Sequence, residues 1–359
     1  MLTFIHAADF HLDSPFRELT GEQAALRRRE QRELLYRLTD LARERKVDFV
    51  FLAGDLFDGA NLYRETGETL ASALGQIDCP VFIAPGNHDP LTSNSPYRDI
   101  LWPENVHIFT RDTIQSMAFE NCVIYGTAFT AMDREDNPLV GFRAPDDGLL
   151  HIMVTHGDVG GRRYAPISLD SIARSGLDYL ALGHIHAASG VQKAGETYWA
   201  YPGCPEGRGF DECGEKGVLV CQLEKGALNA EFVPLCGRRY EQLEVEAGND
   251  ADHAARVALL GHEHDICRLI FVGETDMTPD LPALERSLTE RCFALSLRDR
   301  TTVTRDLWAR AGEDNLTGLF LQELRTRLDE AESEEEKALL ELALRFGLAA
   351  LERGEDCRP

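Results

Sequence analysis

Short apolar runs alternate with helical patterns through the first half of the chain, and this alternation limits the fold more than any other feature. The longer runs predict strands at residues 2–7, 49–53, 81–84, 152–155 and 179–182. Residues 22–46 repeat apolar positions at the spacing of one helix face, but residues 27–32 lack this stripe and are expected to project into solvent. Closely spaced runs at 122–126, 197–201, 218–223 and 230–233 predict a second, mixed or antiparallel sheet. The whole pattern is typical of an α/β fold.

The pattern changes near residues 236–239. The following stretch predicts strand, helix, strand, helix and strand, at 240–246, 251–261, 267–272, 281–292 and 293–298. From residue 306 the pattern is helical, with Leu316, Leu319, Phe320, Leu324 and Leu328 on one stripe and Leu339, Ala343, Phe346 and Ala350 on a second. We therefore expect a main domain at 1–237, a small α/β domain at 238–302 and a helical segment at 303–359.

Charge and cysteine content exclude several classes of protein. Lys and Arg number 37 against 61 Asp and Glu, so the formal net charge is -24. Such a field repels polyanions, and simple electrostatic capture of nucleic acid is disfavoured. The nine cysteines form no CxxC pair, which argues against a zinc knuckle or a disulfide framework. With no signal-peptide pattern and no apolar run of the ~18 residues that a membrane span needs, we expect a soluble, cytoplasmic protein without a membrane partner.

Five short polar motifs each begin directly after a predicted strand. They are Asp9-Phe10-His11, Gly54-Asp55-Leu56-Phe57-Asp58, Gly86-Asn87-His88-Asp89, His156-Gly157 and Gly183-His184-Ile185-His186. Residues that follow the carboxyl ends of strands in an α/β sheet converge on one crevice. The sequence therefore predicts that several carboxylates, several imidazoles and one amide gather at one place.

Such a group needs a counter-charge, because burying carboxylates and imidazoles together is otherwise costly. Two divalent cations would supply it, and mixed oxygen and nitrogen ligands suit Mn²⁺, Fe²⁺ or Zn²⁺. One motif alone would be weak evidence, since Gly-Asn-His-Asp also suits an ordinary turn. All five in order favour a metal site. The remaining histidines, including the pair in His262-Glu263-His264, are expected in ordinary surface or core roles.

The ordered motif set resembles the calcineurin-like metallophosphoesterase superfamily over roughly the first 190 residues. Within it, the chain is similar to the DNA-repair exonuclease branch of SbcD- and YhaO-like nuclease subunits. This similarity lies in residues 6–12, in the Tyr-Pro-Gly-Cys-Pro-Glu-Gly-Arg stretch at 201–208 and in Glu215-Lys216-Gly217. The resemblance implies an αββα-type sandwich of two sheets, followed by a small C-terminal α/β capping domain and terminal helices.

The resemblance also implies a metal-ligand set. One ion would be held by Asp9, His11 and His186, and the other by Asn87, His156 and His184. Asp55 would bridge the two ions, which would be Mn²⁺, with Fe²⁺ or Zn²⁺ as alternatives. Such a pair of ions lowers the pKa of a bridging water and stabilises in-line displacement at phosphorus.

Three further residues take implied roles around the ions. His88 would sit beside the scissile phosphate as an acid or a phosphate-orienting group, and Asp58 would orient His88 by a hydrogen bond. Asp89 would lie behind the ligands. Gly59 and Asp89 stand where Ser/Thr phosphatases carry Arg and Glu, which disfavours protein phosphatase activity. The sequence identifies no substrate-binding residue.

The leading interpretation is a metal-dependent phosphodiester hydrolase, a DNA exo/endonuclease subunit of a repair complex. Its basic clusters are few (27–29, 162–163 and 238–239), so an SbcC-like ATPase partner would have to grip the DNA; a homodimer stays open. The alternative is a phosphodiesterase for cyclic nucleotides or other small phosphodiesters, with the C-terminal half as a lid. A third reading is a catalytically idle metal-binding scaffold, although an intact ligand set argues against it.

Overall fold

The computed structural model describes residues 1–59, 62–248, 250–275, 278–303, 308, 310–331 and 333–353. Its first six-stranded sheet has the order β12-β11-β1-β2-β3-β4. Four neighbouring strands run parallel: β1 (Leu2–Ala7), β2 (Phe49–Leu52), β3 (Val81–Ile83) and β4 (Val106–Ile108). The hairpin of β11 (Gly217–Glu224) and β12 (Ala227–Pro234) extends the sheet, with β11 antiparallel to β1.

The second six-stranded sheet has the order β5-β6-β7-β8-β10-β9. Its central strands are parallel: β6 (Cys122–Gly126), β7 (Leu150–His156), β8 (Tyr179–Gly183) and β10 (Thr197–Ala200). The edge strands β5 (Gln115–Ala118) and β9 (Gln192–Ala194) are antiparallel to their neighbours. Our assignment of 218–223 and 230–233 to this sheet was wrong, because those strands pair with β1. Alternation of apolar residues predicts a strand but not its partner.

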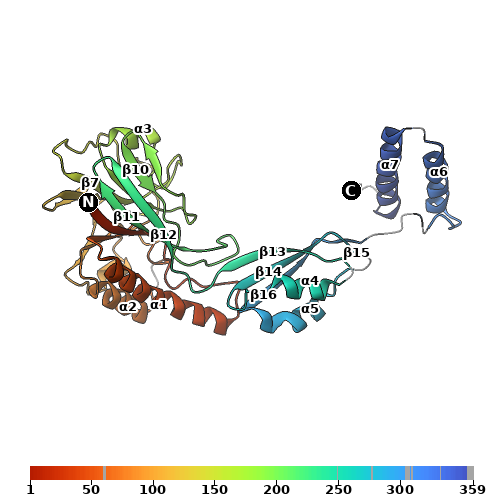
Figure 1. The fold of residues 1–359 in the computed structure, drawn as a ribbon, viewed down its shortest axis with the longest axis horizontal. Coiled ribbons are helices and arrows are strands. Elements are labelled where there is room, and N and C mark those ends of the chain that lie inside the picture. The colour runs from red at the N-terminus through yellow and green to blue at the C-terminus, as the bar shows by residue number, and fades with distance from the viewer. Residues whose placement is uncertain are drawn as a thin grey trace. The chain divides into compact units, whose positions relative to one another are not determined.

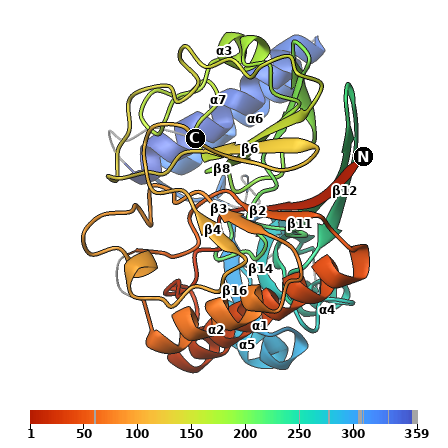
Figure 2. The same cartoon turned by 90° about the vertical axis from the view of Figure 1, so that its left-hand side faces the viewer.

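A core of large side chains joins the two sheets face to face. Phe4 and Phe51 of the first sheet lie in one buried cluster with Ile152 and Tyr179 of the second, and the rings of Phe4 and Tyr179 are 5.1 Å apart. The helices α1 (Gly21–Arg45) and α2 (Arg64–Gly75) cover one outer side, and α3 (Leu169–Arg174) covers the other (Figures 1 and 2). The expected αββα-type sandwich is therefore confirmed.

We expected residues 27–32, in the front half of α1, to project into solvent, but two of them do not. The helix begins with a capping box formed by Thr20 and Gln23, but Arg27 and Gln31 are buried. Arg27 forms ion pairs with Glu30 and with the buried Glu206. Gln31 donates hydrogen bonds to the carbonyls of residues 10 and 11. Apolar periodicity cannot reveal a helix face that is buried through polar partners.

The small α/β region has the predicted order of elements. Its three-stranded sheet, β13-β14-β16, contains β13 (Tyr240–Glu246), β14 (Ile266–Val272) and β16 (Ala294–Asp299). The helices α4 (Ala251–Ala258) and α5 (Leu281–Leu288) alternate with these strands, and the short β15 (Glu274–Thr275) and β17 (Thr302–Val303) pair with each other. The chain divides into two compact units: Met1–Leu243 with Arg256–Leu269 and Glu285–Leu297, and Glu244–Ala255 with Ile270–Leu284 and Arg298–Pro359. Domain boundaries at 237 and 302 stay a prediction.

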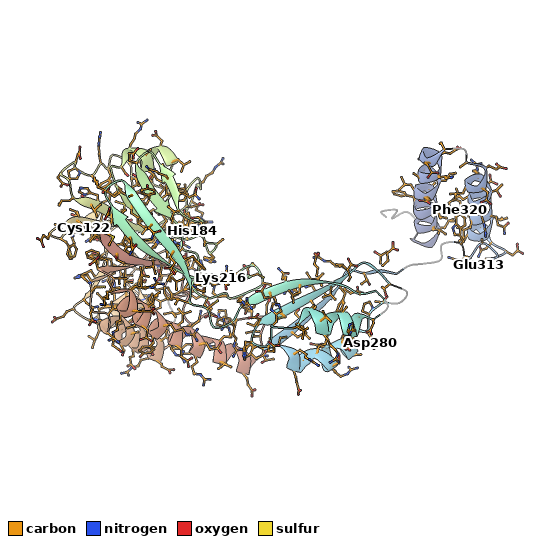
Figure 3. All side chains as sticks on the ribbon, in the orientation of Figure 1. Cys122, His184, Lys216, Asp280, Glu313 and Phe320 are labelled. Carbon is orange, nitrogen blue, oxygen red and sulfur yellow. The ribbon has the colours of Figure 1, made fainter. Side chains whose placement is uncertain are left out.

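Two helices, α6 (Leu316–Glu330) and α7 (Glu334–Arg353), follow as predicted. Helix α6 packs partly through its predicted stripe, with Phe320 and Leu324, whereas α7 packs through another face. Their shared buried cluster is formed by Leu321, Leu324, Leu344 and Leu348, with Phe320 (labelled in Figure 3) packed against it. Leu316, Leu319 and Leu339 of the predicted stripes are more than 60% exposed. On a leucine-rich helix, neighbouring faces carry similar numbers of apolar residues. The sequence alone therefore did not show which face would be buried.

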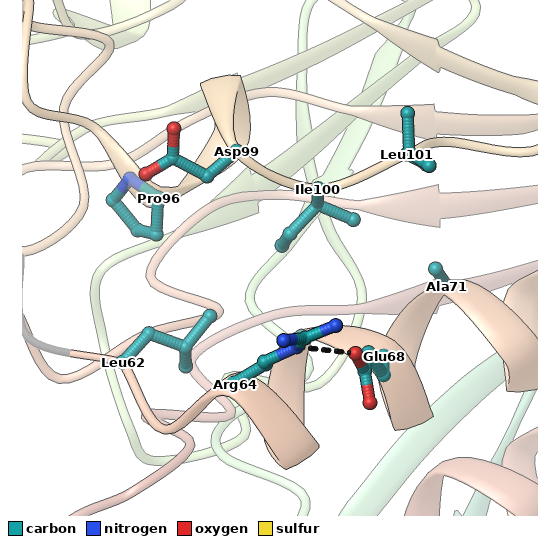
Figure 4. A pocket seen from close by; sticks show the side chains of 9 residues that line it. Leu62, Arg64, Glu68, Ala71, Pro96, Asp99, Ile100 and Leu101 are labelled. Atoms are coloured by element: carbon teal, nitrogen blue, oxygen red, sulfur yellow. Dashed lines mark hydrogen bonds and ion pairs between the residues drawn. The ribbon is translucent and has the colours of Figure 1, made fainter.

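Three further features of the described residues bear on the expectations. The eight cysteines among them are all free, and most are buried; Cys357 lies outside the described residues. None of the described helices is long and apolar enough to cross a membrane. A cavity of about 610 Å³ lies between α2 and residues 96–101, lined by Leu62, Ile100 and Leu101 beside the Arg64–Glu68 ion pair (Figure 4). No predicted site residue lines this cavity.

Candidate metal centre

The five polar motifs meet at one place, as the sequence predicted. Three of them follow β1, β2 and β3 of the first sheet, and two lie at the ends of β7 and β8 of the second. Main-chain hydrogen bonds join the strand ends within each sheet, from the amide of Asp9 to the carbonyl of Gly54 (3.0 Å) and from Gly157 to Gly183 (3.2 Å). The crevice is thus built by two sheets rather than one, and Figure 3 labels His184 there.

The motif backbone is held in conformations that non-glycine residues rarely adopt. Asp9, His11, Asp55 and His184 all have positive φ angles, of 56°, 44°, 52° and 110°. Gly54 also has a positive φ, and a Cβ atom there would come within 2.6 Å of His156 Nδ1. Backbone strain of this kind costs about 1–3 kcal/mol per residue and clusters at functional sites, where the surrounding structure holds it.

The first predicted ligand group, Asp9, His11 and His186, has ligand atoms that all lie within 4.8 Å of one another. Nδ1 of His11 is 3.1 Å from Asp58 Oδ1, and Nδ1 of His186 is 2.7 Å from Glu212 Oε1. A carboxylate only accepts hydrogen bonds, so Nδ1 of His11 carries the proton and its Nε2 is left with a lone pair. The Nε2 atom of His186 lies 3.2 Å from that lone pair. An imidazole lone pair, a second imidazole and the Asp9 carboxylate thus face one small space, and this donor set fits a metal ion.

The second group shows the same chemistry. Nδ1 of His156 is 2.9 Å from the carbonyl oxygen of Ala53, which can only accept, so Nε2 carries the lone pair. That Nε2 lies 2.9 Å from Asn87 Oδ1 and 3.4 Å from Asp55 Oδ2. Nδ1 of His184 lies 3.2 Å from the same amide oxygen. The lone pair of His156 and the oxygens of Asn87 and Asp55 thus converge, with the His184 ring beside them, as expected of ligands around a second cation.

Asp55 lies between the two groups. Its Oδ2 atom is 3.4 Å from His156 Nε2 and 3.7 Å from His11 Nε2. Its Oδ1 atom accepts a hydrogen bond from the backbone amide of His88 at 2.9 Å. A carboxylate within reach of one imidazole from each group could bridge two ions, and this role of Asp55 stays a prediction.

Burial perturbs the ionisation of these groups when they have no cation. It raises the pKa of Asp9 well above its usual range, with the charge of Asp55 adding to the rise. It raises the pKa of Asp55 to about 6 and lowers the pKa of His156 and His184 to about 4. Neutral imidazoles are the form that binds metals, and a divalent cation would offset the cost of the buried carboxylates.

His88 and Asp58 lie at the rim of the centre. The His88 side chain is 48% exposed, and its Nδ1 is 4.0 Å from Asp58 Oδ1. The nearer partner of Asp58 is His11, so Asp58 holds a ligand and also faces His88. His88, Asp58 and His11 themselves form a group that could hold an ion. The assignment of His88 as an acid rather than a ligand stays a prediction.

Asp89 fixes the motif loops rather than facing the ligand groups. Its buried carboxylate accepts hydrogen bonds from the amides of Gly86 (2.7 Å) and Leu56 (2.6 Å) and from the Tyr97 hydroxyl (2.7 Å). Burial raises the pKa of Asp89 to about 6. By these bonds Asp89 ties the loop after β3 to the loop after β2, behind the predicted ligands.

Two site residues, Arg208 and Glu212, received no role from the sequence. Both contact His186, and Arg208 also lies 3.4 Å from Asp58 Oδ1. Burial alone would raise the pKa of Glu212, but hydrogen bonds from His186 and Arg208 hold it below its usual range. One signal was available: the pair follows β10, which is parallel to β8, so its loop leaves the sheet beside the fifth motif.

Two histidines outside the motifs, His6 and His262, have contacts that account for them without a metal. His6 is buried and bonds the Tyr179 hydroxyl (2.9 Å) and the carbonyl of Leu182 (3.1 Å), and burial lowers its pKa to about 3. His262 groups with Glu241 and Asp265. Arg239 already bonds that Asp265 carboxylate at 2.7 Å, so this group is an ion-pair network.

Comparison with known proteins agrees with this geometry. Residues 2–188, more than half of the chain, match the family described as calcineurin-like phosphoesterase. The chain is also similar to a protein of Bacillus subtilis (strain 168) named uncharacterized metallophosphoesterase YhaO, with 34% identity over 274 residues. That alignment covers 72% of this chain and 65% of the relative, which is less than two thirds of the relative's length. The match spans all five motifs and the strands that present them, and the chain belongs to the calcineurin-like phosphoesterase family.

Proposed function

We propose that this metal-dependent phosphoesterase is a DNA exo/endonuclease subunit of a repair complex, dependent on Mn²⁺ and acting in the cytoplasm. The observation that carries the proposal is the convergence of two sets of acceptor atoms on one carboxylate, Asp55, beside a half-exposed histidine, His88. When bound, two divalent ions would activate water and neutralise charge on the phosphate. The imidazole-rich donor set favours Mn²⁺ over Mg²⁺, which prefers oxygen ligands and keeps its waters.

The protein's own residues then have two tasks. The ligand carboxylates and imidazoles place the ions, and Asp58 holds the ring of His11. His88 lies at the rim, where its exposed ring can donate a proton to the leaving oxygen of a bound diester. The backbone amide of His88 donates a hydrogen bond to Asp55 Oδ1, and this bond holds the main chain from which the ring projects.

The preference for DNA is supported by how the loop at residues 201–212 is anchored. Glu206 pairs with Arg27 of α1, and the ring of Phe210 lies 5.1 Å from that of Tyr240, the first residue of β13. The loop that carries Arg208 and Glu212 is thus tied to the start of the predicted capping domain. We propose that the capping domain that begins there serves a long substrate that extends beyond the crevice.

The described basic clusters support the need for a partner. Arg27 is buried in its ion pairs, and Arg163 pairs with Asp133 at 2.7 Å. Arg238 and Arg239 pair with Glu30 and Asp265. At least one arginine of each cluster is thus engaged in an ion pair within the chain. The formal net charge of the chain is -24. We propose that an SbcC-like ATPase supplies the grip on DNA, with a homodimer as a further assembly.

The second candidate function is a phosphodiesterase for cyclic nucleotides or other small diesters, and the acidic charge favours it. One assay separates the two: hydrolysis of linear duplex DNA, a cyclic nucleotide and bis-p-nitrophenyl phosphate by the Mn²⁺-loaded protein. Cleavage of DNA and the aryl diester, without the cyclic nucleotide, is the expected result. Cleavage of the cyclic nucleotide with intact DNA would favour the alternative, and metal binding without hydrolysis would favour an idle scaffold.

A further inference from the structure

The outer nitrogen of His186 faces two groups of opposite hydrogen-bonding character. Nδ1 is 2.7 Å from Glu212 Oε1 and 2.9 Å from Arg208 Nη2, and those two groups are themselves 2.6 Å apart. A carboxylate only accepts and a guanidinium only donates, so the tautomer of His186 decides which contact is a hydrogen bond. If Nδ1 carries the proton it bonds Glu212 and leaves Nε2 free for a metal; otherwise Nε2 carries the proton.

Glu212 is held firmly in this place. Its side chain is 5% exposed, and its Oε2 atom accepts from the backbone amide (2.8 Å) and from Nε (3.2 Å) of Arg208. Arg208 then reaches Asp58 with Nη1, at 3.4 Å. One arginine therefore touches the two carboxylates that face the outer nitrogens of His186 and His11.

Two other histidines of the centre, His11 and His156, show the same arrangement. The outer nitrogen of His11 faces Asp58, and that of His156 faces the carbonyl of Ala53. In each case an acceptor on the outside directs a lone pair toward the inside. Glu212 completes this pattern for His186.

We propose that Glu212, held by Arg208, is a positioning residue that keeps His186 in the Nδ1–H tautomer, with Nε2 directed at the first ion site. Partners of this kind orient a metal-binding imidazole and increase its basicity, and their loss weakens metal binding about 10- to 100-fold. The inference rests on the two-metal centre of the proposed function but not on the choice of DNA as substrate.

The substitution Glu212→Gln tests this role in the full-length protein. It replaces one of two acceptor oxygens by a donor, so the side chain must give up either His186 or the two donors of Arg208. Asp211→Asn is the control, since Asp211 directly precedes Glu212 in the same loop and is exposed. It makes the same exchange of a carboxylate for an amide.

Equilibrium dialysis against Mn²⁺ with elemental analysis gives the readout. We expect the parent and Asp211→Asn to bind two ions with the same affinities, and Glu212→Gln to bind one ion about 10- to 100-fold more weakly. Unchanged binding by Glu212→Gln, or equal weakening in both variants, would overturn the proposal. A parent that binds no ion would instead overturn the proposed function.

A measurement on the parent covers the case in which Glu212→Gln does not fold. Long-range ¹H–¹⁵N spectra of the imidazole rings in metal-free protein report which nitrogen is protonated, and His186→Gln assigns the signal. We expect the Nδ1–H form for His186. An Nε2–H form would mean that Arg208 donates to Nδ1, and the assigned role of Glu212 would be wrong.

Discussion

The substitution Arg27→Met tests the buried ion-pair network that fixes the metal-centre loop to α1. Arg27 is fully buried; Nη1 is 2.7 Å from Glu30 Oε2, and Nη2 bonds Glu206. Glu206 is only 2% exposed. Without the guanidinium it becomes a buried carboxylate that has lost its cation. Breaking a buried pair from one side costs about 3–5 kcal/mol, a large part of the ~5–15 kcal/mol by which domains are stable.

The size of this loss should depend on pH. Burial raises the pKa of Glu206 in the parent, and Arg27 opposes that rise. In the variant the folded-state pKa rises further above the unfolded value, so the folded protein binds more protons than the unfolded one. Stability then falls as pH increases through this range. We expect the deficit of Arg27→Met to be smaller at mildly acidic pH than at alkaline pH.

Urea unfolding of the metal-free protein measures the effect, with Arg29→Met as the control. Arg29 lies two residues after Arg27 in α1, and its side chain is 64% exposed. Its ion pair with Glu33 is long, at 3.9 Å. Such a surface change alters stability by about 0.5 kcal/mol or less. If Arg27→Met is as stable as Arg29→Met, the buried pair does not hold this loop and the reasoning is wrong.

Three other outcomes follow from the site and the core. His88→Ala should keep two metal ions and parental stability but lose ~10²–10⁴-fold in diester turnover, because it removes a positioned acid; loss of an ion in elemental analysis would make His88 a ligand. His6→Gln should flatten the acid side of the stability curve: burial lowers the pKa of His6 from its ordinary value of 6.5 to about 3, so the unfolded state binds more protons and stability falls as pH drops below 6.5. Unfolding curves across this pH range check it, and an unchanged slope would contradict it. Chelation should abolish hydrolysis and Mn²⁺ should restore it better than Mg²⁺ in initial-rate assays, whereas equal rates would contradict the imidazole-rich ligand set.

The sequence predicted the centre well because its signal is local. Each motif follows a strand whose apolar run is plain, and parallel strands carry their carboxyl ends to the same edge. The positive φ angles of Asp9 and Asp55 are consequences of the same turns and were not visible in the residue types.

What the sequence did not predict depends on contacts between distant residues. The pairing of β11 with β1 joins segments more than 200 positions apart, and alternation of apolar residues fits either sheet. Arg27 looked like a solvent-exposed residue because its buried partner, Glu206, lies far along the chain. Glu212 was missed for a related reason, since an isolated carboxylate in a glycine-rich loop resembles a turn residue until His186 is seen beside it.

The central claim, that two cations among these acceptor atoms perform phosphodiester hydrolysis, is tested by one titration. Metal-free protein is supplied with Mn²⁺ in steps while hydrolysis of bis-p-nitrophenyl phosphate is recorded. Because Asp55 lies within reach of an imidazole from each group, we expect two ions to act together. Hydrolysis should be absent without metal, and its rate should saturate when two ions are bound per chain. Full hydrolysis in the presence of a chelator, or a rate that saturates at a single ion, would contradict the account.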